Sequence, residues 1–238
     1  AANPVTEVQG NDQYLRMLLC LGYGPLEIAG HRVGAGYPLL THVEDVGDAI
    51  RIGETNIAQY DDVEWEIGSP EQITLYTQDI VEEPVSAALD LQDRTTGGGR
   101  LDSTDNVSAV RTTAPNTREI SLDVTWPSGL YTVDSKGDAF TATVHMRIEY
   151  RPLGGDWLTH FDGNVSAKRK ETLRRSWRWT VLEGQYEVRV TRVSTYSQNR
   201  EAHITDAVWT ALRSVQGNSR PYTGQHVVMA LRIRANDQ

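Results

Sequence analysis

The fold is decided by a stretch that reads YLRMLLCLGYGPLEI over residues 14–28 and AIRIGETNIAQYDDVEWEI over residues 49–67. The first apolar run stops at the Gly-Tyr-Gly-Pro of residues 22–25, and the second stops at the Gly-Glu-Thr-Asn of residues 53–56. Glycine and proline interrupt a chain in this way where a strand meets a tight turn. The stretch therefore predicts short strands joined by turns, and it offers no catalytic group.

Hydrophobic and acidic side chains alternate toward the end of this stretch. One side of the predicted strand carries Val63, Trp65 and Ile67, and the other side carries Asp62, Glu64 and Glu66. A period of two is typical of a half-buried strand whose polar side faces solvent. Residues 73–80 are a further candidate for a short strand, which Pro84 is expected to end, and residues 29–48 have the composition of a loop.

From residue 118 onward the pattern changes to longer alternating runs, separated by turn signals such as Ser-Lys-Gly-Asp. The runs are REISLDVTW, FTATVHMRIEYR, DWLTHFDG, ETLRRSWRWTV, QYEVRVTRVS and AVWTALRSV. Several short strands at this spacing predict an all-β sandwich, and Trp157 with the YEVRV run resembles a fibronectin type III arrangement. Residues 206–215 fit either a strand or a helix capped by Thr205 or Asp206, and we favour the strand.

Composition supports a β protein of one large or two smaller domains. The 238 residues are 39% hydrophobic and include 6 Trp and 10 Tyr but only 2 Phe; aromatic and β-branched residues favour strands. The single cysteine, Cys20, excludes an internal disulfide and a four-cysteine zinc site. No run reaches the roughly 18 apolar residues of a membrane span, and no signal peptide is visible. The final run, VVMALRIRA, ends so near residue 238 that we expect a piece of a longer protein.

Charge is distributed unevenly along the sequence. Residues 1–110 carry a net charge of −14 and residues 111–238 one of +5, which together give −9. A general nucleic-acid binder would be basic along one face, so this distribution argues against that class. It fits a subunit that meets charged neighbours in an assembly, but solvated surface is the default explanation.

Several segments, taken in order, resemble the tail-tip attachment proteins of long-tailed bacteriophages, the J-type or host-specificity proteins. Besides residues 14–28 and 49–67, these segments are LYTQDIVEEPVSAAL (75–89), SLDVTWPSGLY (121–131), MRIEYRPLGGDWL (146–158), GQYEVRVTRV (184–193) and MALRIRANDQ (229–238). The resemblance covers nearly the whole chain. Residues 29–48 lie where relatives can be much shorter, and the resemblance leaves that loop unplaced.

The resemblance implies a structural virion protein of the phage tail tip, made in the bacterial cytoplasm. In the family the hub is a homotrimer that closes the tail tube and passes DNA on infection. Other tail-tip and tail-tube proteins are its partners, and regions outside this chain meet the host receptor. The resemblance implies no sequence-specific binding of nucleic acid and no residue-level site, because the shared motifs are packing and turn motifs.

The same resemblance, with the patterns above, implies an all-β fold of two domains. A discontinuous hub β domain would comprise residues 1–90 and 222–238. A glycine-rich connection would span residues 91–117, around the three glycines 97–99. A fibronectin type III-like or Ig-like β-sandwich of residues 118–221 would be inserted into the hub domain.

No arrangement of residues predicts catalysis, a cofactor or a metal. The six histidines are scattered, with no His-x-His pair and no i, i+4 pair. Neighbouring carboxylates at Asp61-Asp62 and Glu82-Glu83 point to opposite faces of a strand, so they cannot form the facing pair of a glycosidase. The GGGR of residues 97–100 lacks a P-loop pattern, and residues 102–106 lack a calcium-loop pattern. We therefore expect that the protein is not an enzyme.

The candidate functional residues lie in one basic and aromatic run, KRKETLRRSWRW, at residues 168–179. Its candidate interface cations are Lys168, Arg169, Lys170, Arg174 and Arg175. A contact between subunits is one interpretation. Stacking of single-stranded nucleic acid or an anionic glycan on Trp177 and Trp179 is a second, and plain surface is the third. Because the tryptophans alternate with Arg178, one face of this strand should be core and the other solvated.

Two functions of other classes stay open on the sequence alone. A carbohydrate-binding sandwich would use exposed aromatic residues as its platform, with Tyr131, Trp157 and Tyr196 as candidates. A glycan-degrading enzyme would need two carboxylates facing each other across a cleft. A hub subunit should instead form a threefold oligomer and bind no small sugar.

Overall fold

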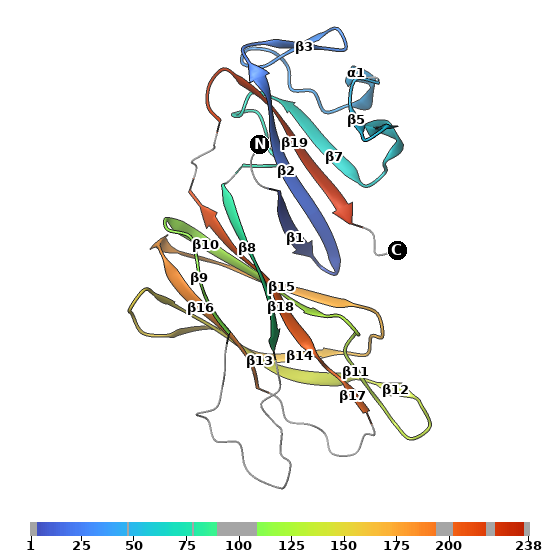
Figure 1. Cartoon of the computed structure of the whole chain (residues 1–238), viewed down its shortest axis with the longest axis vertical. Coiled ribbons are helices and arrows are strands. Elements are labelled where there is room, and N and C mark those ends of the chain that lie inside the picture. The colour runs from blue at the N-terminus through green and yellow to red at the C-terminus, as the bar shows by residue number, and fades with distance from the viewer. Residues whose placement is uncertain are drawn as a thin grey trace. The chain divides into compact units, whose positions relative to one another are not determined.

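The computed structural model describes residues 4–46, 48–77, 79–89, 109–193, 202–217 and 222–235. Its regular structure is almost entirely β, which confirms the predicted fold class, and the described chain adds one four-residue helix and one 3-10 turn (Figure 1). The chain divides into two compact units: Ala1–Val81 with Gln216–Gln238, called the first unit below, and Glu82–Val215, called the sandwich.

The first unit is built on an antiparallel sheet with the strand order β1-β2-β19-β7. Its strands are β1 (Val5–Gln9), β2 (Asp12–Tyr23), β19 (His226–Ala235) and β7 (Val63–Gly68). Strand β19 pairs with β2 on one side and with β7 on the other. Its side chains are buried on both faces of the sheet, as the full burial of the neighbours Val227 and Val228 shows. The last strand of the chain is therefore the centre of the first sheet.

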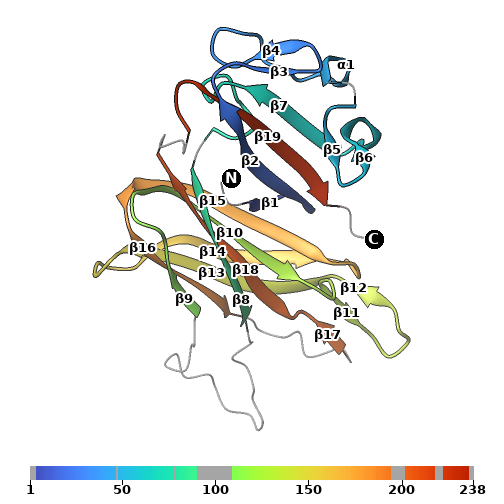
Figure 2. The same ribbon diagram turned by 45° about the horizontal axis from the view of Figure 1, so that its top comes forward.

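The segment between β2 and β7 covers one face of this sheet. It contains β3 (Leu26–Ile28), β4 (His31–Val33), α1 (Val43–Val46), β5 (Arg51–Ile52), β6 (Thr55–Asn56) and the 3-10 turn η1 (Ile57–Gln59), as Figure 2 shows. Val33, Val46 and Ile57 pack against Trp65, Ile67 and Met229 in one buried cluster. Residues 29–48, unplaced by the resemblance, thus supply part of the core. The predicted break at residues 22–25 is confirmed, because β2 ends at Tyr23 and β3 starts after Gly24, whose φ is +81°.

Two expectations for the first unit are wrong. Glu66 does not face solvent: it is 7% exposed and accepts hydrogen bonds from the amides of Thr74 (2.6 Å) and Leu75 (2.9 Å) and from the Thr74 hydroxyl. Residues 73–77 form a loop and no strand. The hydrogen bonds from Thr74 and Leu75 to Glu66 hold this loop against the sheet. Burying a carboxylate is tolerable when several donors satisfy it, so the loop and the buried acid depend on each other.

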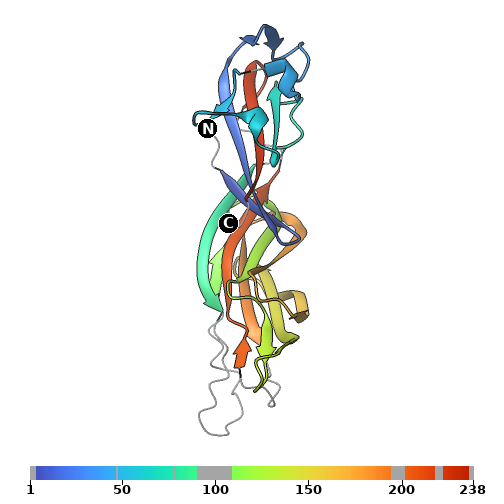
Figure 3. The same cartoon turned by 90° about the vertical axis from the view of Figure 1, so that its right-hand side faces the viewer.

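The sandwich consists of two four-stranded sheets that lie face to face (Figure 3). One sheet has the order β15-β10-β18-β8, with β15 (Leu173–Gly184), β10 (Thr117–Trp126), β18 (Ala207–Gln216) and β8 (Ile80–Leu89). The other has the order β14-β13-β16-β9, with β14 (Leu158–Ala167), β13 (Ala142–Pro152), β16 (Tyr186–Val193) and β9 (Ala109–Thr112). A small third sheet joins β12 (Ala139–Phe140), β11 (Tyr131–Val133) and β17 (Ala202–Ile204).

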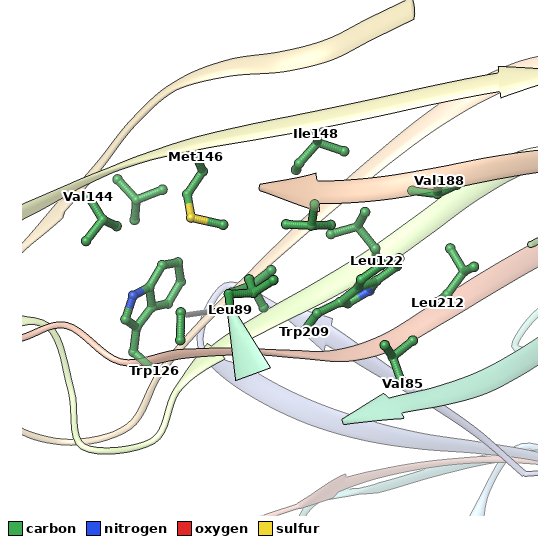
Figure 4. Packing of buried hydrophobic residues seen from close by; sticks show 14 of the residues in the cluster. Val85, Leu89, Leu122, Trp126, Val144, Met146, Ile148, Val188, Trp209 and Leu212 are labelled. Carbon is green, nitrogen blue, oxygen red and sulfur yellow. The ribbon is translucent and has the colours of Figure 1, made fainter. Parts of the chain in front are cut away.

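Alternation along the strands fills the space between the two large sheets. On β10 every second side chain is fully buried, and Trp209 and Leu212 of β18 lie beside them. They face Met146, Ile148 and Val188 of the opposite sheet (Figure 4). Each such side chain contributes roughly 1.5–3 kcal/mol by burial. The strand interpretation of residues 206–215 is confirmed, whereas Trp157 takes no part in this core.

The boundaries of the sandwich differ from those expected. Strand β8 belongs to a sandwich sheet, although the sequence assigned residues up to 90 to the hub domain. Strand β9 belongs to the other sheet, although residues 91–117 were expected to form a connection. Pro84 lies inside β8 and does not end it; β8 is an edge strand, where a missing amide donor is tolerated. The three glycines 97–99 lie outside the described residues.

A buried network of ion pairs and hydrogen bonds joins all four strands of one sandwich sheet. Arg213 of β18, 4% exposed in its side chain, donates to Asp123 of β10 (2.6 Å) and to Glu82 of β8 (3.3 Å). The Ser176 hydroxyl of β15 also donates to Asp123. Burial alone would lower the pKa of Arg213, but the hydrogen bond and charge of Asp123, together with Glu82, outweigh it and raise that pKa. The guanidinium therefore stays charged and holds β8 to its sheet.

The turn after β10 fixes the chain that follows β14. Leu130 and Arg169 exchange two backbone hydrogen bonds, of 2.8 and 3.1 Å, and the Thr172 hydroxyl donates to the Pro127 carbonyl. Gly129 lies in the left-handed region at φ +83°, and a Cβ there would lie 2.2 Å from the Arg169 carbonyl oxygen. Only glycine fits, so the Trp-Pro-Ser-Gly sequence is a packing motif that holds residues 169–172.

We predict that Arg213→Ala destabilises the sandwich by about 3–5 kcal/mol, because it leaves the Asp123 carboxylate buried without its cation. The matched control is Arg118→Ala, which breaks the exposed pair with Glu183 (side chains 60% and 50% exposed) and should cost about 0–1 kcal/mol. Urea unfolding followed by tryptophan fluorescence measures both. Equal effects of the two substitutions would contradict the importance of the buried network.

We predict that Gly129→Ala destabilises the sandwich by about 2–4 kcal/mol, since backbone strain and a steric clash add together. Gly137→Ala is the control for strain alone, because Gly137 has φ +86° and a Cβ there meets nothing within 4 Å. That control should cost about 1–2 kcal/mol. Thermal unfolding by circular dichroism compares the two, and similar losses for both variants would show that the close approach of Arg169 carries no cost.

Candidate functional site: a basic segment between two edge strands

The five predicted interface cations lie where the chain passes from one sandwich sheet to the other. Lys168, Arg169 and Lys170 connect β14 to β15, and Arg174 and Arg175 lie at the start of β15. Both strands are at the edge of their sheets. Lys168, Lys170 and Arg175 are exposed, whereas Arg169 and Arg174 are half-buried. Residues 168–175, called the basic segment below, therefore present charge along one side of the sandwich.

The basic segment differs from the rest of the sandwich in how its charge is balanced. Elsewhere arginines pair with carboxylates on neighbouring strands, as Arg189 does with Glu149 (2.7 Å) and Arg151 with Glu187 (2.6 Å). In the part of the chain that the structure describes, Lys168, Lys170 and Arg175 have no ion pair. Arg169 reaches Glu171 only at 3.8 Å, and that carboxylate is 77% exposed. The charges of Lys168, Lys170 and Arg175 are thus not neutralised by the described residues of the sandwich.

The two tryptophans of this run are already stacked within the protein. A bulge in β14 places His160 and Phe161 toward β15. The His160 ring stacks on Trp179 with centroids 4.1 Å apart, and the Phe161 ring packs on Trp177 at 5.4 Å. Burial lowers the pKa of His160, which favours the neutral ring in this position. The structure therefore does not offer these tryptophans as a free stacking platform for bases or sugars.

The two described aromatic residues proposed for a sugar platform each have a cation near the ring. Two guanidinium carbons lie over the Trp157 ring, that of Arg151 at 4.5 Å and that of Arg189 at 4.1 Å from its centroid. The Nζ atom of Lys170 lies 6.0 Å from the centroid of the Tyr131 ring. Tyr196 lies outside the described residues. A row of solvent-facing rings, which a carbohydrate-binding module needs, is thus not assembled from the described pair.

The carboxylates expected to stay apart do so in the sandwich. Glu82 points to Arg213 and its neighbour Glu83 to Arg111 at 3.6 Å, so each serves a separate ion pair. Among the described residues no group of three or more His, Cys, Asp or Glu side chains could hold a metal ion. Residues 102–106, the weak calcium-loop candidate, fall outside the described part. A search of the described helices finds none long and apolar enough to span a membrane.

The two structural units differ less in net charge than residues 1–110 and 111–238 do. The first unit carries a net charge of −8 and the sandwich one of −1. The basic half is therefore not a basic domain, because acidic residues between positions 82 and 110 belong to the same unit. Sequence reasoning found the cations but missed Gly129 and Leu130, which hold them; the Trp-Pro-Ser-Gly-Leu run was the available signal.

Comparison with known protein families finds a match for the sandwich. Residues 77–218 match the family described as tip attachment protein J, FNIII-A domain. The match takes in every strand of the sandwich from β8 to β18 and covers well over half of the chain. A search of curated proteins finds no match. With the sandwich topology and the match in agreement, the chain belongs to the tip attachment protein J family of phage tails, in which its residues 77–218 form the FNIII-A domain.

Proposed function

We propose that this chain is a structural part of the hub at the phage tail tip. The observation that carries the proposal is the family match over residues 77–218. The chain topology supports it: the sandwich interrupts a sheet that β19 completes, as expected of a module inserted into a hub domain. The first unit would be the hub β domain, and the sandwich would be a separately folded module inserted into its sequence.

In this proposal the protein assembles as a homotrimer with other tail-tip and tail-tube proteins. The trimer closes the tail tube, lets DNA pass on infection, and carries further regions of the polypeptide that contact the host receptor. It is made in the bacterial cytoplasm and ends in the virion. In this proposal the protein acts through shape and contacts, without catalysis, and the match to a tail attachment family supports it.

We predict that antibodies raised against this chain label the tail tip of the phage particle that carries it. Gold-labelled antibody on purified virions, seen by negative-stain electron microscopy, measures the position. Label at the end of the tail distal to the capsid is expected, and preadsorption with the purified chain is the control. Label along the tail shaft or on the capsid, or no label on intact particles that contain the polypeptide by mass spectrometry, would contradict the proposal.

A further inference from the structure

The charges left unbalanced on the sandwich have a counterpart in the first unit. Residues 44–62, called the acidic segment below, carry a net charge of −5, and the basic segment carries +4. Glu44, Glu54 and Asp61 of the acidic segment are exposed. None of the three has an ion pair with the residues that the structure describes. Each unit therefore presents three exposed charges of one sign that have no ion pair among the described residues.

Both segments are anchored by hydrogen bonds. In the acidic segment the amide of Ala49 donates to the Val46 carbonyl, the amide of Ile57 donates to the Ile50 carbonyl, and the Asn56 side chain donates to Asp48. The basic segment is fixed by the paired bonds between Leu130 and Arg169. A preformed surface loses little conformational entropy when it binds. The free energy gained from modest electrostatic attraction is therefore not offset by the cost of ordering the backbone.

The character of the basic segment selects a protein partner over a nucleic acid. Stacking on aromatic rings is what a single-stranded nucleic acid would need beyond charge, and Trp177 and Trp179 are covered by Phe161 and His160. Carboxylates on a fixed surface need no stacking. The acidic segment also carries Tyr60, which is 38% exposed and can add apolar contact at such an interface.

We infer that the basic segment of one copy binds the acidic segment of a second copy of this chain. Two different patches on each copy make the contact heterologous, the kind that closes into a ring when the rotation permits. This inference rests on the proposed function, since it names the surfaces through which hub subunits would meet. Charge complementarity sets register and speeds association, and it weakens as salt rises.

The test uses charge reversal in the 238-residue chain. One variant carries Lys168→Glu, Lys170→Glu and Arg175→Glu, the second carries Glu44→Lys, Glu54→Lys and Asp61→Lys, and the third combines all six. Sedimentation velocity at low and at physiological salt measures self-association. Either three-fold reversal should weaken association by about tenfold or more at low salt, and the six-fold variant should regain it because the two signs are exchanged together.

The control variant carries Arg32→Glu, Arg118→Glu and Lys136→Glu, three exposed cations outside the basic segment, and should associate as the unchanged chain does. Circular dichroism verifies that each variant is folded. The six-fold variant should also fail to associate with the unchanged chain, since like charges then face each other. This last measurement separates a specific contact from a general effect of net charge.

Three results would overturn the inference: no self-association of the unchanged chain at low salt, no recovery in the six-fold variant, or unchanged self-association in the first variant with loss only of oligonucleotide binding. The labelling of virions reports on the proposed function independently. Label at the tail tip together with any of these three results would reject this interface and leave the hub assignment standing, whereas loss of both would reject both.

Discussion

The pairing of β19 with both β2 and β7 is the interaction on which the arrangement of this chain depends. Strand β2 ends at Tyr23 and β7 begins at Val63, yet the strand between them comes from residues 226–235. Bringing distant segments together costs about 0.6 kcal/mol for each doubling of the loop. A folded sandwich shortens that loop, because β8 and β18, which carry the chain in and out, are neighbours in one sheet. The amide of Gln216 then donates to the Asp79 carbonyl at 2.8 Å where the chain leaves it.

Charge placement divides into pairs that build the fold and charges that the fold leaves over. The Arg213 network is buried, so the removal of its cation would strand a carboxylate in a poorly solvated place. The pairs of Arg189 with Glu149 and of Arg151 with Glu187 are more exposed and contribute little energy, but they neutralise these charges between β13 and β16. Compared with these pairs, Lys168, Lys170 and Arg175 differ in having no ion pair with the described residues. The difference lies in which charged residues have a partner and not in the net charge, since the sandwich as a whole is almost neutral.

Alternation in the sequence predicted strands wherever one face is uniformly apolar, as in β10 and β13, because burial of that face leaves a single register. Alternation could not predict the burial of Glu66, because that burial depends on three hydrogen-bond donors supplied by a loop. It also misjudged Pro84, since a proline is compatible with a strand only at an edge, and edge position is a property of topology. For the site, the five cations could be read from the sequence. The lack of an ion pair between Lys168, Lys170 or Arg175 and the described residues could not be predicted. Neither could the cover that His160 and Phe161 give to the tryptophans, because both require knowledge of which strands are neighbours.

Cations on an edge strand also have a simpler use, which is to prevent unwanted pairing with another sheet. The two uses make different demands on the backbone. Keeping an edge soluble needs only charge somewhere along β14 and β15, and flexible lysines serve as well as fixed ones. The basic segment is instead anchored by two backbone bonds to Leu130, next to a turn that only Gly129 can make. Such anchoring adds nothing to edge protection, but it fixes the backbone positions from which the Lys168 and Lys170 side chains extend. A surface whose charges start from fixed positions is suited to recognising a partner whose charges are fixed as well.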